Sequence, residues 1–257
     1  MSNENIKRDN STTRRFLDES GISNGMRVLE IGCGPGEVTE ILTELVGSSG
    51  QVVAIDNNEQ YLRAARDRLQ GLSAERVHYE LADVNDEPLE LSGIETESFD
   101  ALVGRRVLMY LNNPSDTLRN LCAYLKRGAK VVFEEVDLTM VPGRLTPMNA
   151  HDKTAEYFQR MLAAEGADSA MGFRLPTTYV DAGIAFDRIR AEAVIEGQGS
   201  QYTYAQLLSH VQDRLEAGSI ATKSEIKSLQ QELEAESQDA TRVYVSGMSF
   251  CAFGCKP

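Results

Sequence analysis

Tryptophan is absent from this chain of 257 residues, and it has only four cysteines and three histidines. The cysteines show neither the paired C-x-x-C spacing of a zinc site nor the density of a disulfide scaffold. We therefore expect no metal site and reduced thiols at Cys33, Cys122, Cys251 and Cys255, although Cys251 and Cys255 are close enough in sequence to form a bridge.

Long apolar runs are also lacking. No stretch approaches the roughly 18 apolar residues that a membrane helix needs. The start, MSNENIKRDNSTTRRF, lacks the apolar centre of a signal peptide. These absences predict a cytoplasmic protein without a membrane partner.

Basic residues are outnumbered, with 26 Lys and Arg against 39 Asp and Glu, for a net charge of −13. A polyanion would be repelled, so we expect no nucleic-acid partner. The hydrophobic content of 42% supports a substantial core. This length and composition are typical of one large domain, here residues 1–257, that carries an insertion.

Strands and helices are predicted to alternate along the first half of the chain. Apolar runs predict strands at 27–31, 51–56, 76–83, 99–104 and 130–136. Helical spacing marks the segments between them, with Asn57 or Asn58 as one N-cap and Asn113 before Pro114 as another. A further short helix is expected at 13–19, and Gly128 suits the C′ position after the Pro114 helix. This rhythm predicts an α/β fold with a doubly wound, mostly parallel sheet.

The regular alternation of strands and helices ends after residue 137. We expect a long connection, helices at 150–166 and 176–182, a sixth strand at 185–197, and two helices separated by a turn at Gly218 and Ser219. Residues 138–180 and 203–237 would thus form helical insertions, or a lid, that recognise a substrate. The stripe of Ile226, Leu229 and Leu233 is a candidate homodimer seam. A last strand at 241–253 changes parity at Gly247, which predicts a β-bulge.

The stretch VLEIGCGPGEVTEI, residues 28–41, places three glycines between a strand and a helix. Glycine tolerates positive φ and lets a ligand approach bare backbone, and the N–H groups of the following helix are free. The loop formed by Gly32, Cys33, Gly34 and Gly36 is therefore a predicted cofactor cradle.

The spacing of the loop indicates which cofactor it would hold. A dinucleotide fingerprint needs a third glycine where this chain has Glu37, whose carboxylate would repel a pyrophosphate. Glu30, two residues before the first glycine, suits a cationic group such as an ammonium. A cofactor without phosphates is therefore predicted.

These residues resemble the cofactor loop of class I S-adenosylmethionine-dependent methyltransferases. The resemblance extends through VVAIDNN, LADVND, FDALVGRRVLMYL and LKRGAKVVFEE in the order and spacing of that family. It implies a seven-stranded sheet whose final strand is antiparallel. It also implies S-adenosyl-L-methionine as the cofactor.

The resemblance also assigns roles to individual residues. Asp56 would accept the ribose hydroxyls, with helix capping as the alternative. Asp83 would accept from the adenine amino group beside the backbone of Val84, with a surface-loop carboxylate as the alternative. Asn57 and Ala82 would line the pocket. Arg105 would contact the amino-acid end of the cofactor through its backbone, while the neighbouring Arg106 is equally suited to a surface ion pair.

The expected reaction is in-line transfer of the sulfonium methyl group to a small organic molecule. The family needs no universal catalytic residue, since positioning in a dry pocket supplies most of the effect. His151 and Glu135 are candidate general bases. The alternative for His151 is an exposed histidine at a helix start, and the alternative for Glu135 is a structural role. Two rival functions are cofactor binding without methyl transfer and nucleotide-dependent oxidoreduction. The acceptor atom stays open.

Overall fold

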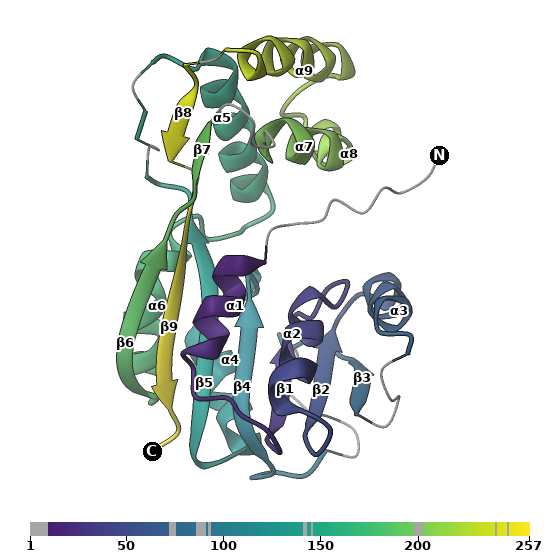
Figure 1. The fold of residues 1–257 in the computed structure, drawn as a ribbon, viewed down its shortest axis with the longest axis vertical. Coiled ribbons are helices and arrows are strands. Elements are labelled where there is room, and N and C mark those ends of the chain that lie inside the picture. The colour runs from purple at the N-terminus through teal and green to yellow at the C-terminus, as the bar shows by residue number, and fades with distance from the viewer. Residues whose placement is uncertain are drawn as a thin grey trace. The chain divides into compact units, whose positions relative to one another are not determined.

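The larger sheet of the chain has seven strands in the order β3-β2-β1-β4-β5-β9-β6 (Figure 1). The computed structural model describes residues 10–71, 76–85, 91, 94–140, 143–144, 146–197, 203–239, 241–245 and 247–257. The predicted absence of a signal peptide concerns residues that lie mostly outside these ranges. Within them, no helix is long and apolar enough to cross a membrane.

The chain divides into two compact units. The sheet unit comprises Asp9–Val136, Met171–Ala191 and Ser249–Pro257, and the helical unit comprises Asp137–Ala170 and Glu192–Met248. Residues 171–180, which were predicted to belong to the first insertion, therefore lie with the sheet.

The strands of the sheet are β1 Arg27–Ile31, β2 Gln51–Asp56, β3 Val77–Leu81, β4 Phe99–Arg105, β5 Leu125–Asp137, β6 Ala185–Glu192 and β9 Met248–Cys255. Its helices are α1 Ser11–Asp18, α2 Glu37–Val46, α3 Glu59–Arg68, α4 Pro114–Leu121 and α6 Met171–Ala182, with short 3-10 turns at η1 Leu108–Tyr110 and η2 Cys122–Tyr124. The predicted α/β class with a doubly wound sheet is confirmed.

Strands β3, β2, β1, β4 and β5 pair in parallel. Strand β9 runs the other way. Gly128, near the start of β5, donates to the Lys256 carbonyl, and Lys256, just past the end of β9, donates to the Ala129 carbonyl. Because the end of β9 lies beside the start of β5, the two strands are antiparallel.

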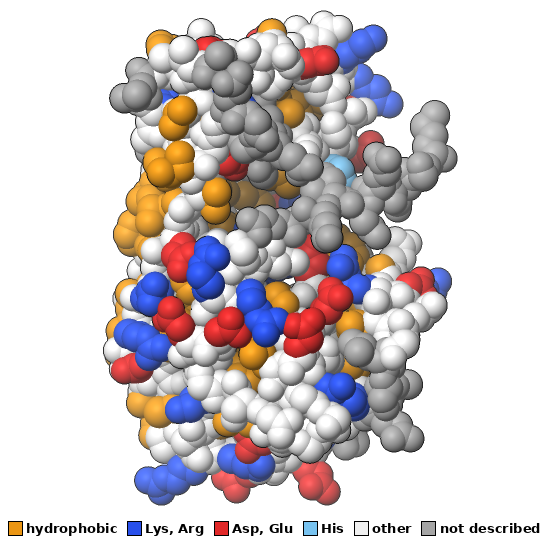
Figure 2. Space-filling view, viewed as in Figure 1, with side chains coloured by type: hydrophobic (Ala, Val, Ile, Leu, Met, Phe, Trp, Pro, Cys, Tyr) orange, Lys and Arg blue, Asp and Glu red, His pale blue; other side chains and the backbone are white. Residues whose placement is uncertain are grey.

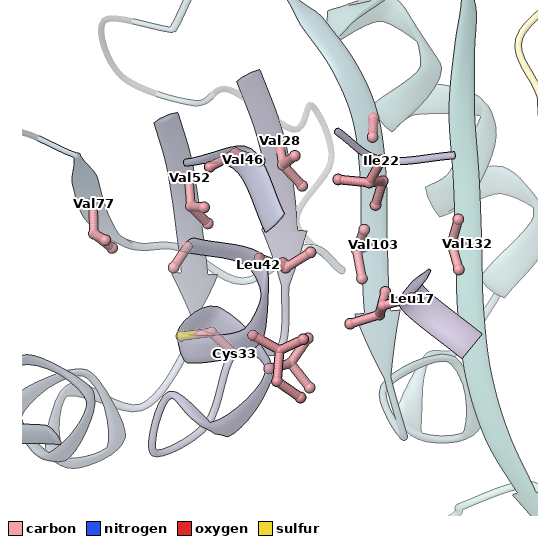
Figure 3. Packing of buried hydrophobic residues seen from close by; sticks show 14 of the residues in the cluster. Leu17, Ile22, Val28, Cys33, Leu42, Val46, Val52, Val77, Val103 and Val132 are labelled. Atoms are coloured by element: carbon pink, nitrogen blue, oxygen red, sulfur yellow. The ribbon is translucent and has the colours of Figure 1, made fainter. Parts of the chain in front are cut away.

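Helices cover both faces of the sheet, as neighbouring residues of β5 show. Val132 belongs to a buried cluster with Leu17 of α1 and Leu42 of α2 (Figure 3). Phe133 faces the opposite side, where its ring meets Tyr179 of α6 edge-on at 6.4 Å between centroids. This two-sided burial explains why the central strands are apolar runs without alternation.

The helical unit contains α5 Asn149–Ala164, α7 Thr203–His210, α8 Gln212–Ala217 and α9 Lys223–Ser237, together with the strand pair β7 Ile195–Gly197 and β8 Val243–Val245. The stripe of Ile226, Leu229 and Leu233 on α9 is fully buried within the chain. The prediction that this stripe forms a homodimer seam is therefore wrong, since its apolar face is already covered by other helices of the unit.

Three local predictions need correction. Gly128 lies within β5 rather than at a C′ position, because the helix that begins at Pro114 ends at Leu121. The sixth predicted strand splits into β6 and β7. The last predicted strand splits into β8 and β9, which belong to different sheets. The parity change at Gly247 therefore marks a change of sheet and not a bulge.

Candidate functional site

The glycine loop turns sharply from β1 into α2, as predicted. Gly32, Gly34 and Gly36 all adopt positive φ, at 63°, 53° and 83°. Gly36 is the N-cap of α2 in the left-handed conformation. Residues with a β-carbon rarely adopt these values, so the backbone itself requires glycine here.

The surroundings of the three glycines differ. A β-carbon added at Gly32 would lie 2.7 Å from Val107 Cγ2, and one at Gly36 would lie 3.0 Å from Ala65 Cβ. One at Gly34 would meet no heavy atom within 4 Å. Gly32 and Gly36 thus allow close packing of the chain on itself, whereas Gly34 borders open space that a ligand can fill.

Asp56, at the end of β2, contacts this loop directly. Gly34 N donates to Asp56 Oδ2 at 2.8 Å, and Asn58 N donates to Oδ1 at 2.9 Å. The carboxylate is only 8% exposed. Helix capping is performed by Asn58, two residues further along, whose Oδ1 accepts from Gln60 N and Tyr61 N at the start of α3. Each Asp56 oxygen keeps a lone pair for a further donor.

Three of the predicted pocket residues lie beside Asp56. Ala82 N donates to the Asp56 carbonyl at 3.2 Å. Asn57 Nδ2 donates to Asp83 Oδ2 at 3.2 Å. The Asp83 carboxylate also accepts from Asn85 N and Nδ2, and these bonds lower the pKa of Asp83. The ends of β2 and β3 therefore bring Asp56, Asn57, Ala82 and Asp83 together, with the mostly buried Val84 next in the chain.

Glu30 of β1 is 1% exposed, and its Oε2 has no hydrogen-bond partner among the described residues. Burial raises the pKa of the Glu30 carboxyl to about 8. The Thr39 hydroxyl of α2 is near enough to favour the charged form, yet Thr39 Oγ1 makes no hydrogen bond of normal geometry. A buried carboxyl oxygen without a partner is costly, so this position is suited to a cationic ligand group.

Arg105 is engaged within the protein. Its guanidinium donates to the Glu37 carboxylate, to Asn10 Oδ1 at 2.8 Å and to Thr13 Oγ1 at 3.2 Å. A direct pairing of its side chain with a cofactor carboxylate is therefore not what this structure shows. Because Glu37 is neutralised by Arg105, its carboxylate also repels a phosphate less than the sequence suggested.

Cys33 completes the loop as a packing residue. It is buried in the apolar cluster under α2, and burial raises the pKa of its thiol far above the usual range. All four cysteines are free, as predicted. In the part of the chain that the structure describes, no group of three or more His, Cys, Asp or Glu side chains is arranged to hold a metal ion.

Glu135, a candidate base, holds the turn after β4. Its Oε1 accepts from Val107 N at 3.0 Å and Leu108 N at 2.7 Å. The side chain is fully buried, which raises its pKa to about 8. These bonds fix the turn at Val107, the residue that packs against Gly32. Glu135 therefore has a structural role, which was the alternative to its role as a general base.

His151, the other candidate base, lies in the helical unit and is 1% exposed. Its ring stacks on Tyr204 at 4.3 Å between centroids and meets Tyr244 at 4.6 Å. Burial lowers the pKa of His151 to about 4, and Arg144 and Arg242 add to this effect. His151 does lie at the start of a helix, but the alternative that it is exposed there is wrong. The ring packs in an aromatic cluster with these two tyrosines.

Three apolar residues within the first predicted insertion also serve the core of the helical unit. Tyr157, Phe158 and Met161 of α5 are buried. Three further residues were not predicted from the sequence, although they lie next to predicted cofactor-binding residues. They are Thr39 beside Glu30, Asn85 beside Asp83, and Val107 beside Gly32. Asn85 carries the one recognisable signal, because an Asn two residues after an Asp is a common turn pattern.

On the face shown in Figure 2, Lys and Arg side chains are interspersed with Asp and Glu. The described residues on that face form no extended basic surface of the kind that tracks a nucleic-acid backbone.

Comparisons with known proteins agree with this geometry. A family model described as a methyltransferase domain matches residues 22–171, more than half of the chain. The chain is 34% identical over 124 residues to a ubiquinone/menaquinone biosynthesis C-methyltransferase of Pseudomonas fluorescens, covering 48% of this chain and 46% of that protein. Among curated relatives, the chain spans between 33% and 52% of the other protein's length.

Solved structures share the fold at low sequence identity. A candidate methyltransferase from Bacillus halodurans has a TM-score of 0.63 at 16% identity, covering 96% of this chain and 99% of that one. A phosphoethanolamine N-methyltransferase of Haemonchus contortus, in complex with S-adenosyl-L-methionine, has a TM-score of 0.57 at 18% identity, covering 96% and 52%.

Proposed function

This chain belongs to the class I S-adenosylmethionine-dependent methyltransferase family, and on that premise we propose that it transfers a methyl group from S-adenosyl-L-methionine to a small organic molecule. The observation that carries the proposal is the set of groups around Gly34. Open space at Gly34 lies next to the Asp56 carboxylate, and the buried Glu30 oxygen without a partner belongs to the strand that leads into the same loop.

The residues present fit the cofactor group by group. Asp56 supplies two acceptors for the two ribose hydroxyls. The Asp83 carboxylate and the backbone of Val84 would receive the adenine. Glu30 would hold the ammonium of the amino-acid end, since a buried carboxylate needs a cationic partner. The backbone of Arg105 would contact that end, while its side chain binds Glu37 and Thr13 of α1.

The bound cofactor supplies an activated methyl group with a neutral thioether as its leaving group. The protein then has to hold the acceptor in line and to exclude water. One oxygen of Glu135 accepts from two backbone N–H groups, and the His151 ring stacks on Tyr204 and meets Tyr244 at an edge. We therefore infer that positioning, and not a dedicated base from this pair, is the main contribution of the chain.

The acceptor is proposed to be a small molecule because the chain is acidic, with a net charge of −13. Support also comes from the quinone-pathway C-methyltransferase that the chain resembles. We further propose that residues 138–180 and 203–237 contribute to acceptor recognition within a single functional domain. A cytoplasmic location is supported by the four free thiols.

Titration calorimetry with S-adenosylmethionine and S-adenosylhomocysteine tests cofactor binding. We expect saturable binding of both, and no heat at millimolar ligand would contradict the proposal. Mass spectrometry of reactions with candidate acceptors then tests transfer. A gain of one methyl mass in an acceptor supports a methyltransferase, whereas consistent binding without any methylated product across acceptor classes supports the non-methylating alternative.

A further inference from the structure

On one face of the sheet, the acidic side chain of Glu30 on the first strand lies near a basic side chain that is paired with another acid. Glu30 of β1 pairs in register with Val103 of β4, and Arg105 lies two residues further along β4 on the same face. Glu37 begins α2 above this face. Arg105 pairs with Glu37, which also lies 3.9 Å from Arg68 Nη2, and Glu30, Glu37 and Arg105 are all mostly buried.

Arg105 is committed to Glu37 and not to Glu30. Its donors are taken by the Glu37 carboxylate, Asn10 Oδ1 and Thr13 Oγ1. Glu30 makes no hydrogen bond or ion pair with Arg105 and is affected by it only through the electrostatic attraction of the Arg105 charge. No Lys, Arg or His among the described residues forms an ion pair with Glu30, so its charge has no direct counterion.

The other neighbours of Glu30 offer no replacement cation. The titratable, charged or polar groups that act on Glu30 are Cys33 of the loop, Thr39 of α2, Asp56 of β2, Tyr79 of β3 and Arg105 of β4. Arg66 of α3 lies over the Tyr79 ring, 5.3 Å from its centroid, and not in an ion pair with Glu30. Cys33 and Tyr79 are neutral because burial raises the pKa of each well above its usual range, and Asp56 disfavours a second negative charge. A solvent proton is then the available cation when no ligand is bound.

We propose that a proton and the ammonium group of the cofactor compete for Glu30, so that cofactor binding releases the proton to solvent. The inference rests on the proposed function, because it requires a ligand with an ammonium group at this loop. The balance is simple: the Glu30 carboxyl loses its proton, the carboxylate gains the ammonium as its partner, and the buffer takes up the proton. Cofactor binding is thereby coupled to pH.

The coupling has a defined direction. Below about pH 7, each increase of one pH unit should raise the affinity about tenfold, because one proton must leave for each ligand bound. Near pH 8 the rise should stop, since Glu30 is then ionised without the ligand. The test belongs below pH 7, where the ligand's own amino group stays protonated and Glu30 is the group whose ionisation changes.

Titration calorimetry in two buffers of different ionisation enthalpy counts the released protons. With S-adenosylhomocysteine at pH 6.5, we expect about one proton released per ligand bound. The matched ligand is 5′-methylthioadenosine, which has the adenosine and no amino acid and should release none. Glu30→Gln should bind S-adenosylhomocysteine more weakly, without proton release and without the rise of affinity with pH. Asp56→Asn should bind more weakly but still release the proton.

The outcomes separate this inference from the proposed function. If S-adenosylhomocysteine binds with no proton released, or with the same release as 5′-methylthioadenosine, the exchange at Glu30 is refuted and the proposed function stands. If neither ligand binds, the proposed function itself fails. If Glu30→Gln does not fold, the comparison of the two ligands on the wild-type protein still decides the question.

Discussion

Gly34→Ala separates ligand binding from stability. The substitution keeps the Gly34 N–H that Asp56 accepts and adds one methyl group. Since no heavy atom lies within 4 Å of the new carbon, the folded protein bears only the cost of a left-handed backbone at alanine, about 1–2 kcal/mol. For a chain of this size that cost lowers the melting temperature by about 2–8 °C.

The effect on the ligand should be larger, because the new methyl group occupies the space into which we place the cofactor. We expect the affinity for S-adenosylhomocysteine to fall at least about tenfold, or about 1.4 kcal/mol, measured by titration calorimetry well below the melting temperature. Gly183→Ala is a matched control. Gly183 has a φ of 79°, open space at its β-carbon, and a place in the turn after α6. It should lose similar stability and keep its affinity.

Two results would refute this reasoning. One is a Gly34→Ala protein that binds S-adenosylhomocysteine as tightly as the wild type does. The other is an equal loss of affinity in Gly34→Ala and Gly183→Ala, which would assign the effect to general destabilisation. Circular dichroism melts of both variants establish that their stabilities match.

Further expectations concern the buried charges. Asp56→Asn should weaken cofactor binding at least about tenfold by calorimetry, because one ribose hydroxyl loses its ionised acceptor; unchanged affinity would remove Asp56 from the site. Burial raises the pKa of Glu30 and Glu135 to about 8, so the unliganded protein binds these protons more tightly than the unfolded chain does. Its free energy of unfolding should therefore fall from about pH 5 to pH 8, by up to about 5 kcal/mol per carboxyl. Glu30→Gln should flatten this dependence in denaturant titrations, and an equally steep curve would contradict the assignment. His151 has the opposite sign: its pKa is lowered to about 4, so it favours folding above pH 6.5 and that stability is lost between pH 6.5 and 4. His151→Phe should reduce this acid sensitivity, as followed by tyrosine fluorescence.

Local signals in the sequence were sufficient for the sheet and the loop. The glycines at 32, 34 and 36 require positive φ, and Asn58 and Asn113 cap helices where the pattern predicts caps. These features depend on residues within one turn of each other. Such short-range chemistry can be recognised in a single sequence.

Contacts between residues far apart in the chain could not be predicted from the sequence. Arg105 pairs with Glu37, which lies 68 positions earlier, and nothing local distinguishes that pair from a surface ion pair. The burial of His151 could not be predicted because its aromatic partners, Tyr204 and Tyr244, lie more than 50 residues away. The segment that begins at Val243 has the parity of one irregular strand, and only tertiary packing divides it between two sheets.

A crystal structure of the protein with S-adenosylhomocysteine tests the central claim most directly. The account predicts ribose hydroxyls within hydrogen-bond distance of both Asp56 oxygens, backbone contact with the ligand at Gly34, and the ligand's amino group at Glu30. A ligand bound elsewhere, or bound at the loop with its amino group remote from Glu30 and its ribose remote from Asp56, would contradict it.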